Sequence, residues 1–270
     1  MRTSLIAFSW GFKQVSKKLL LLTVPCFCLF LSGYTFAAAR PQSEPIVPAC
    51  HIQLSSFLQP WGDHYSADVE EWEGVFKRHK ELGFQTVILQ WSHWGKRPYG
   101  EPVVPDWLKS ALVAGRNTKV SLKIGTLYDP GFDRGLNGEK PIWYLKKHHD
   151  WNLAFASNLA GFLKLHPELI PAFSGWYISD EVDSSWLLNL SKKRLLTAYF
   201  QDMSTGLKRN ISAPVSMTGY TQAAVVSPKL AERWAAFLNN TAVQTLYSQD
   251  GIGAELQTHN SAKKWNELLG

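Results

Sequence analysis

Apolar, strand-like segments alternate with helix-like segments along residues 50–270, and this alternation constrains the fold more than any other feature of the sequence. Six strand–helix pairs follow one another, each about the size of one unit of a (β/α)8 barrel. The predicted strands cover residues 51–58, 85–91, 119–125, 175–183, 213–217 and 242–247, and the predicted helices cover residues 68–82, 106–114, 142–169, 186–209, 228–239 and 261–269.

Local signals support several of these boundaries. Asp68 followed by Glu71 is a capping box that predicts the start of the first helix, and Gly83 is suited to its end. Ser227 before Pro228 predicts an N-cap and a first helical position. Helix starts of this kind, each close behind a strand, favour parallel strands joined by helical crossovers.

A doubly wound open sheet is the competing fold for an alternating chain. It would carry a Gly-rich phosphate loop after the first strand, and no such loop follows here. We therefore predict an α/β fold of the (β/α)8 TIM-barrel type, with about six of the eight units present. Two further units would need roughly 50 to 70 residues. We expect the chain to be C-terminally truncated. It should be poorly stable and inactive as it stands, because strands one and six would present exposed edges and the barrel would be incomplete.

Residues 175–183 (Gly-Trp-Tyr-Ile-Ser-Asp-Glu-Val-Asp) begin as a buried strand and end in three carboxylates. A carboxylate inside a strand costs several kcal/mol unless it is paired, so Asp180 and Glu181 are expected where the strand leaves the core. In a (β/α)8 barrel, catalytic groups lie at this carboxyl end of the strands. The simpler alternative is that these acids only form ion pairs with nearby Lys or Arg side chains.

Hydrolysis of a glycosidic bond requires two carboxyl groups, one of them a protonated general acid. Glu181 is the predicted acid. A ring at Trp176 or Tyr177 and the negative charge of Asp180 or Asp183 would each raise its pKa. Asp180 is the weaker candidate, because adjacent strand residues point to opposite faces.

Aromatic and polar side chains recur where the predicted strands end. Aromatic rings stack on the apolar faces of sugars, while amides and carboxylates bind hydroxyl groups, so this recurrence predicts a carbohydrate site. Any single ring could instead belong to the barrel core. The predicted substrate-binding residues are Gln59, Trp61, Gln90, Trp91, Tyr128, Tyr177, Asp183, Tyr220, Tyr247, Gln249 and Asp250.

Four motifs carry a family resemblance: residues 57–61 (Phe-Leu-Gln-Pro-Trp), 89–91 (Leu-Gln-Trp), 175–183, and 249–253 (Gln-Asp-Gly-Ile-Gly). Together they resemble a family of bacterial exported proteins that is known as a domain of unknown function and regarded as a glycoside-hydrolase-like TIM barrel. The resemblance extends from residue 52 to the end of the chain. It implies the fold more strongly than the reaction.

The chain is also similar to retaining glycosidases of the large barrel clan. In that clan the acid lies at the end of strand four, which Glu181 matches, and the nucleophile lies at the end of strand seven. The sequence departs from this pattern in two ways. Asp180 stands where the clan usually has Asn, and no seventh strand is predicted.

Residues 1–39 differ in kind from the rest of the chain. Four basic side chains precede the apolar run 19–36, and three alanines follow, which predicts a signal peptide cleaved after Ala37 or Ala39. An uncleaved membrane anchor is the alternative. A Pro-rich linker at residues 40–49 would lead into the barrel domain at residues 50–270. We therefore expect a periplasmic or secreted protein with no membrane contact after cleavage.

Removal of the signal peptide changes the charge and the cysteine content. Taking its four basic groups from 28 leaves 24 basic and 22 acidic side chains, so no nucleic-acid partner is expected. Cys26 and Cys28 leave with the signal and Cys50 has no partner, so no disulfide is expected.

No other motif in the sequence strongly indicates a metal, cofactor or catalytic site. His148 and His149 are predicted to be a solvated helix pair rather than a metal site, because neither has a second ligand three or four residues away. The sequence has no metalloprotease, serine-hydrolase or P-loop motif, and neither a metal nor a cofactor is expected. The expected partner is a poly- or oligosaccharide. The alternative to a hydrolase is a non-catalytic carbohydrate-binding pseudoenzyme associated with exopolysaccharide processing or export.

Overall fold

A computed structural model describes residues 54–95, 99–249, 252 and 255–269, all within one compact unit, Gln53–Gly270. The predicted signal peptide, the linker, the three cysteines and Asp250 lie outside the described residues.

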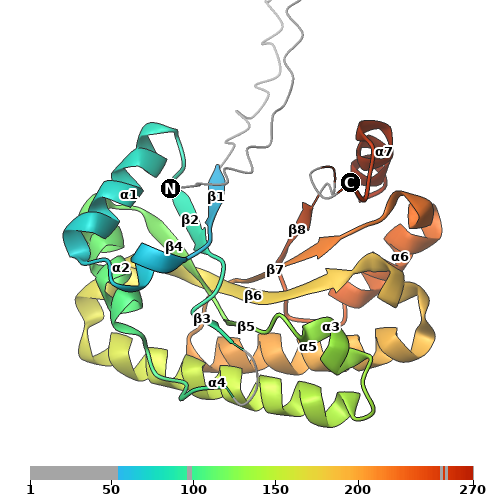
Figure 1. The fold of residues 1–270 in the computed structure, drawn as a ribbon, viewed down its shortest axis with the longest axis horizontal. Helices are drawn as coiled ribbons and strands as arrows, with labels where there is room; N and C mark the ends of the chain where they lie inside the picture. The colour runs from blue at the N-terminus through green and yellow to red at the C-terminus, as the bar shows by residue number, and fades with distance from the viewer. Residues whose placement is uncertain (1–53, 96–98, 250–251, 253–254, 270) are drawn as a thin grey trace, which may run out of the picture. The chain divides into compact units, whose positions relative to one another are not determined.

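Six parallel strands form the main sheet, which curls as a half-barrel (Figure 1). The strands stand side by side in chain order, as expected for successive strand–helix units. This confirms the predicted α/β class and parallel sheet, while the count of eight units stays a prediction. In sheet order they are β1 (Ser55–Leu58), β2 (Thr86–Leu89), β4 (Ser121–Gly125), β6 (Phe173–Asp183), β7 (Val215–Tyr220) and β8 (Thr245–Gln249).

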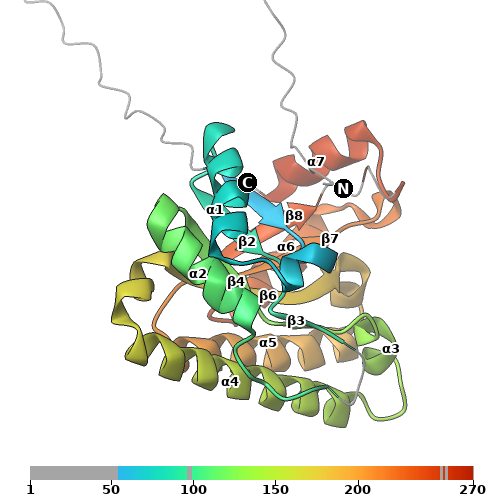
Figure 2. The ribbon, with the colours of Figure 1, turned by 60° about the vertical axis from the view of Figure 1, so that its left-hand side comes forward.

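Helices cover the convex face of this sheet, with α4 and α5 running side by side beneath β6 (Figures 1 and 2). Among the described helices, none is both long enough and apolar enough to cross a lipid bilayer. The helices are α1 (Val69–Glu81), α2 (Asp106–Thr118), α3 (Phe132–Leu136), α4 (Pro141–Leu165), α5 (Leu190–Asn210), α6 (Pro228–Leu238) and α7 (His259–Leu269).

Short elements lie at the strand ends, where the sequence had predicted only loops. Two short strands, β3 (His93–Trp94) and β5 (Leu127–Tyr128), pair in parallel as a second sheet just beyond β2 and β4. Four 3-10 helices complete the described elements: η1 (Gly62–Tyr65), η2 (Pro167–Ala172), η3 (Ser184–Leu188) and η4 (Ala223–Val225).

The predicted caps are present. The Asp68 carboxylate accepts from the Glu71 backbone N–H at 2.9 Å, and the Glu71 carboxylate accepts from that of Asp68 at 3.0 Å. Ser227 accepts from the Leu230 N–H at 3.3 Å, with Pro228 at the first position of α6. These side chains occupy amide donors that a helix start leaves unpaired, so the sequence placed both starts correctly.

Two predicted helices needed correction. The helix predicted for residues 142–169 ends at Leu165, because Pro167 cannot donate to the helical ladder, and η2 follows it. The helix predicted for residues 186–209 begins only at Leu190. Asn189 caps it by accepting from the Lys192 N–H at 3.0 Å, and the preceding residues form η3.

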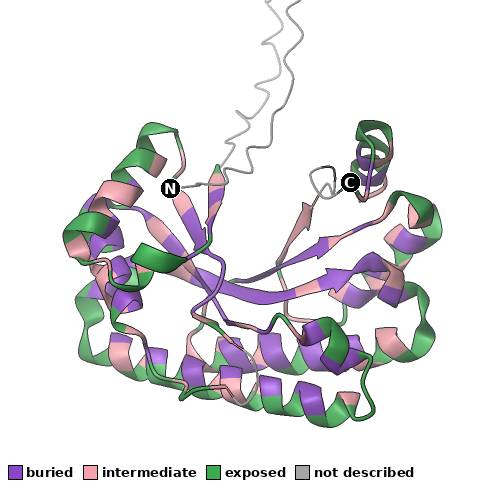
Figure 3. Ribbon diagram, in the orientation of Figure 1, coloured by how far each residue is buried: buried purple, intermediate pink, exposed green. Residues whose placement is uncertain are grey.

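The core lies between the sheet and the helices, and β6 is buried along nearly its whole length (Figure 3). Trp176 faces the helices, with its ring centroid 6.5 Å from that of Phe155 on α4. Tyr177 faces the concave side, where its ring lies 5.4 Å from that of Phe57. The face of β6 that carries Tyr177 is therefore the one that leads to the predicted site.

A bulge interrupts β6 before its end. Ile178 pairs with Met217 and Val182 with Gly219, so four steps along β6 match two along β7. Ser179 holds the bulge: its N–H donates to Thr126 Oγ1 at 3.0 Å, and its hydroxyl donates to the Gln90 carbonyl oxygen at 2.7 Å. Bulges of this kind redirect side chains near functional sites.

Candidate active site

Glu181 stands near the carboxyl end of β6, within a network of hydrogen-bonded side-chain amides. Its Oε1 accepts from Gln249 Nε2 at 3.0 Å and from Gln90 Nε2 at 3.4 Å. Burial raises the pKa of Glu181, the hydrogen bond from Gln249 lowers it, and the charge of Asp180 raises it, with a net upward shift. The raised pKa agrees with the predicted direction, but Trp176 lies on the other face of β6 and does not contribute to it.

The amide network continues across the ends of β1 and β2. Gln59 Nε2 donates to Gln90 Oε1 at 2.8 Å, and Trp61 Nε1 donates to Gln59 Oε1 at 3.1 Å. Side chains from the ends of four strands are thus linked, because the carboxyl ends of parallel strands lie at one edge of the sheet. The structure brings together Gln59, Trp61, Gln90, Glu181 and Gln249. Their roles toward a substrate stay predictions.

Four aromatic side chains form a platform beside this amide network. The Trp61 centroid lies 4.4 Å from that of Trp94 and 4.8 Å from that of Trp91, and Trp94 stacks on Tyr128 at 4.5 Å. Trp61 is 44% exposed and Trp94 41%, whereas Trp91 is 1% exposed. The prediction that Trp91 stacks on substrate is corrected: its ring is covered and supports the exposed pair.

A cavity of about 330 Å³ adjoins the platform. Burial lowers the pKa of His93 in its wall to about 4, so this imidazole is neutral near pH 7. The cavity therefore offers aromatic faces and uncharged polar groups, a lining suited to a neutral ligand. It is lined by Trp61, Tyr65, Ser92, His93, Trp94, Pro105 and Trp107.

Two further predicted binding residues lie deeper, inside the curl of the sheet. Tyr177 is fully buried, and its hydroxyl shares a hydrogen bond of 2.9 Å with Thr218. Tyr247 accepts from Lys123 Nζ at 2.8 Å, and its ring lies 5.2 Å from that of Phe57. Tyr177 thus fills the interior beneath Glu181, which corrects its assignment as a contact for substrate, while Tyr247 is partly exposed.

Asp183 has a structural task at the end of β6. Its carboxylate accepts from the Ser185 N–H at 2.8 Å, which caps η3, and from Gln222 Nε2 at 3.3 Å. Burial raises the pKa of Tyr220, and the neighbouring charge of Asp183 raises it further. Tyr220 and Asp183 therefore lie together, but the side chain of Asp183 is largely committed to protein donors.

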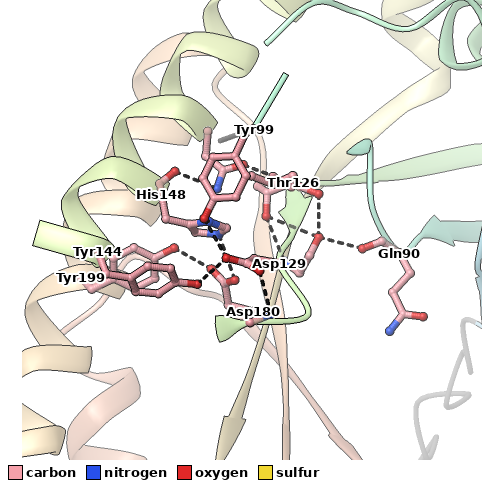
Figure 4. Close-up of polar contacts among 12 residues, drawn as sticks. Gln90, Tyr99, Thr126, Asp129, Tyr144, His148, Asp180 and Tyr199 are labelled. Atoms are coloured by element: carbon pink, nitrogen blue, oxygen red, sulfur yellow. Dashed lines mark hydrogen bonds and ion pairs between the residues drawn. The ribbon is translucent and has the colours of Figure 1, made fainter. Parts of the chain in front are cut away.

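The sequence analysis missed a buried cluster on the other face of β6 (Figure 4). His148 is 0% exposed, with Nε2 3.0 Å from Asp180 Oδ1, so the predicted solvated pair is wrong for this residue. Its neighbour His149 is partly exposed and lies 3.2 Å from Asp150. One signal could have revealed the difference: Tyr144, His148 and Asn152 recur at four-residue spacing on one buried face of α4.

No group of three metal-ligating side chains gathers within the described ranges. The absence of a metal site stays an expectation from the sequence.

Comparison with known proteins adds a family and a fold. The family model "Domain of unknown function (DUF4434)" matches residues 55–270. Uncharacterized protein YbcH of Escherichia coli is 25% identical over 197 residues, which span 72% of this chain and 64% of YbcH, less than two thirds of that relative.

A solved structure from Bacteroides thetaiotaomicron, that of a candidate alpha-L-fucosidase, aligns with a TM-score of 0.52 and 21% identity. The alignment covers 79% of this chain and 69% of that one. At this level of identity the likeness concerns the fold alone, a curled parallel sheet of the TIM-barrel-like type.

Proposed function

This chain belongs to the DUF4434 family, and we propose that it is a glycoside-hydrolase-like protein that binds a poly- or oligosaccharide across the strand ends around Glu181. One observation carries the proposal. A partly buried carboxyl group with a raised pKa lies near the end of the fourth strand of the sheet, hydrogen-bonded to side-chain amides and beside two exposed tryptophans. Trp61 and Trp94 would stack on sugar rings, and the amides of Gln90 and Gln249 would bind hydroxyl groups.

Under this proposal Glu181 acts as the general acid. Its proton passes to the glycosidic oxygen as the bond from that oxygen to the anomeric carbon breaks, while a second carboxylate attacks that carbon or activates water. Asp183 is a poor choice for the second group, because it caps η3. The glycosidase resemblance assigns that group to the end of a seventh strand.

A second candidate function is binding without hydrolysis, and two hydrogen bonds favour it. Oε1 of Glu181 accepts from two amides, which stabilises the ionised carboxylate rather than the protonated acid. An ionised Glu181 would accept hydrogen bonds from sugar hydroxyls and hold a glycan without cleaving it.

Measuring sugar release and affinity separately tests both functions. The full chain is assayed on a panel of bacterial and plant polysaccharides for new reducing ends, and by titration calorimetry for affinity. For a hydrolase, Glu181→Gln lowers turnover by at least ~10²-fold with little loss of affinity. Glu232→Gln, an exposed change on α6, is the matched control. Binding without release supports the second function, and neither binding nor release on any polysaccharide contradicts both.

Residues 1–39 also support export to the periplasm or beyond. The mass of the protein recovered from the periplasm or medium should then correspond to a chain that begins at residue 38 or 40. Recovery of the uncut chain from the membrane fraction would support the anchor instead.

A further inference from the structure

Six polar side chains form a buried cluster on the helix side of β6, which we call the Asp–His cluster (Figure 4). They come from the segment before α2, the segment after β5, and from α4, β6 and α5. Within the part of the chain that the structure describes, His148 is the basic side chain at ion-pair distance from a carboxylate of this cluster. Its members are Tyr99, Asp129, Tyr144, His148, Asp180 and Tyr199.

On one side of the cluster, the hydrogen bonds of two tyrosines require a proton on His148. Tyr99 and Tyr144 each donate to Asp129 Oδ2 at 2.9 Å. Burial raises the pKa of both phenols and the charge of Asp129 raises it further, so both remain protonated. The single proton of Tyr99 is committed to Asp129, yet His148 Nδ1 lies 3.1 Å from the Tyr99 oxygen. The Nδ1 atom must therefore supply a proton to that contact.

The other side of the imidazole requires a second proton. His148 Nε2 lies 3.0 Å from Asp180 Oδ1, and both atoms are buried with no other hydrogen-bond partner. The contact has ion-pair distance but falls short of hydrogen-bond geometry. Without a proton on either atom, two lone pairs would face each other in a site closed to water. Tyr199 cannot provide that proton, because its hydroxyl donates to Asp180 Oδ2 at 2.5 Å.

We infer that Asp129, His148 and Asp180 of the Asp–His cluster together hold two protons, and that His148 thereby acts through Asp180 as a positioning residue for Glu181. Two ionised carboxylates and a neutral imidazole would hold only one proton. The count is the same wherever the extra proton lies. If Asp129 carried it, Tyr99 would donate to His148 Nδ1, and Nε2 would donate to Asp180. A second reason supports the count: two buried carboxylates without a compensating cation are costly.

The extra proton matters for Glu181 because Asp180 is its neighbour on the bulge. The charge of Asp180 is one of the influences that raise the pKa of Glu181. A cluster with one net negative charge, rather than two, limits that influence. The other groups near Glu181 are the amides of Gln90 and Gln249 and the phenols of Tyr128, Tyr177 and Tyr220, which stay protonated because burial and nearby carboxylates raise their pKa values.

Nuclear magnetic resonance of the full chain counts the protons directly. Ring ¹⁵N shifts of His148 and carboxyl ¹³C shifts of Asp129 and Asp180 are recorded at pH 7, and His149→Gln separates the two neighbouring histidine signals. The expected total is two protons over the three side chains. A total of one overturns the inference, and this measurement needs no variant of the cluster.

Two variants test the positioning role through the carboxyl ¹³C titration of Glu181. Asp180→Asn keeps one negative charge in the cluster, at Asp129, so the Glu181 midpoint should stay within about 0.3 pH units of wild type. His148→Gln leaves two carboxylates without the imidazole, so the midpoint should rise by about 1 pH unit. An unchanged midpoint in His148→Gln overturns the role of His148.

Only the catalytic meaning of this role rests on the proposed function. A protein without any glycosidase activity, but with two protons in the cluster, would contradict the proposed hydrolase and leave the inference standing. A glycosidase with one proton in the cluster would support the proposed hydrolase and contradict the inference.

Discussion

Replacing Glu181 by glutamine should stabilise the folded protein at pH 8 and leave its stability unchanged near pH 4. The pKa of Glu181 is raised in the folded state by burial and by Asp180, against an ordinary value of about 4.3 in the unfolded chain. Below about pH 4.3 the carboxyl is protonated in both states and costs nothing. As the pH rises from there through the folded pKa, the unfolded state ionises more readily, so wild type loses stability that the glutamine variant retains.

The size of this effect follows from the cost of burying an ionised carboxylate, which the hydrogen bond from Gln249 partly offsets. Because that carboxylate keeps hydrogen-bond donors, a gain on the order of 1 kcal/mol at pH 8 is expected. Glutamine preserves the shape of the side chain and leaves an Oε1 that can still accept from the neighbouring amides, so packing should contribute little to the difference.

Urea unfolding followed by tryptophan fluorescence at pH 4, 6 and 8 measures this gain. With a slope of about 3 kcal/mol per molar, the midpoint of the variant should move up by roughly 0.3 M at pH 8 and not at pH 4. The exposed change Glu232→Gln should show no such dependence on pH. A difference that is constant from pH 4 to 8, or that favours wild type as the pH rises, would refute the argument.

Three further substitutions test other parts of the structure. Trp61→Ala should weaken binding of a recognised glycan by about 1 kcal/mol in calorimetry, whereas Trp143→Ala, exposed on α4, should not; equal affinities would place Trp61 outside the site. Gly125→Ala should cost about 1 to 3 kcal/mol in urea unfolding, because a Cβ there would lie 2.4 Å from the backbone of Gln90. Gly161→Ala on α4, where a Cβ meets nothing, should be neutral or stabilising. Asp68→Ala should cost about 1 kcal/mol through loss of the α1 cap, and an unchanged midpoint would mean that the cap contributes nothing.

Much of the fold was predictable because it depends on local signals. Strand–helix alternation implies parallel neighbours in chain order, and capping residues such as Asp68 and Ser227 mark helix starts. The convergence of Gln59, Gln90 and Glu181 followed from the same reasoning, since the ends of parallel strands lie at one edge of the sheet. What escaped prediction depends on partners that are distant in sequence.

Exposure at the strand ends is one such property. Trp61, Trp91 and Trp94 all follow strands, and nothing in their local sequence shows which of the three side chains is exposed. The structure buries Trp91 because the other two rings, from separate segments, pack over it and because its Nε1 donates to the Pro60 carbonyl oxygen at 3.2 Å. The state of His148 was missed for a similar reason: the spacing on α4 defines a face, but only docking of that face against β6 makes it an interior one.

The departure of this chain from the glycosidase pattern at position 180 can be understood from what Asp180 contacts. The bulge in β6 directs Glu181 to the amides of Gln90 and Gln249, and leaves Asp180 on the opposite side, against His148 and Tyr199. An asparagine there could donate its amide hydrogen to a neutral imidazole, with no extra proton required. An aspartate cannot donate unless it is protonated, so it requires a proton that it shares with His148. The choice of Asp over Asn therefore replaces a neutral hydrogen-bonded pair by a pair that holds the extra proton next to the proposed acid.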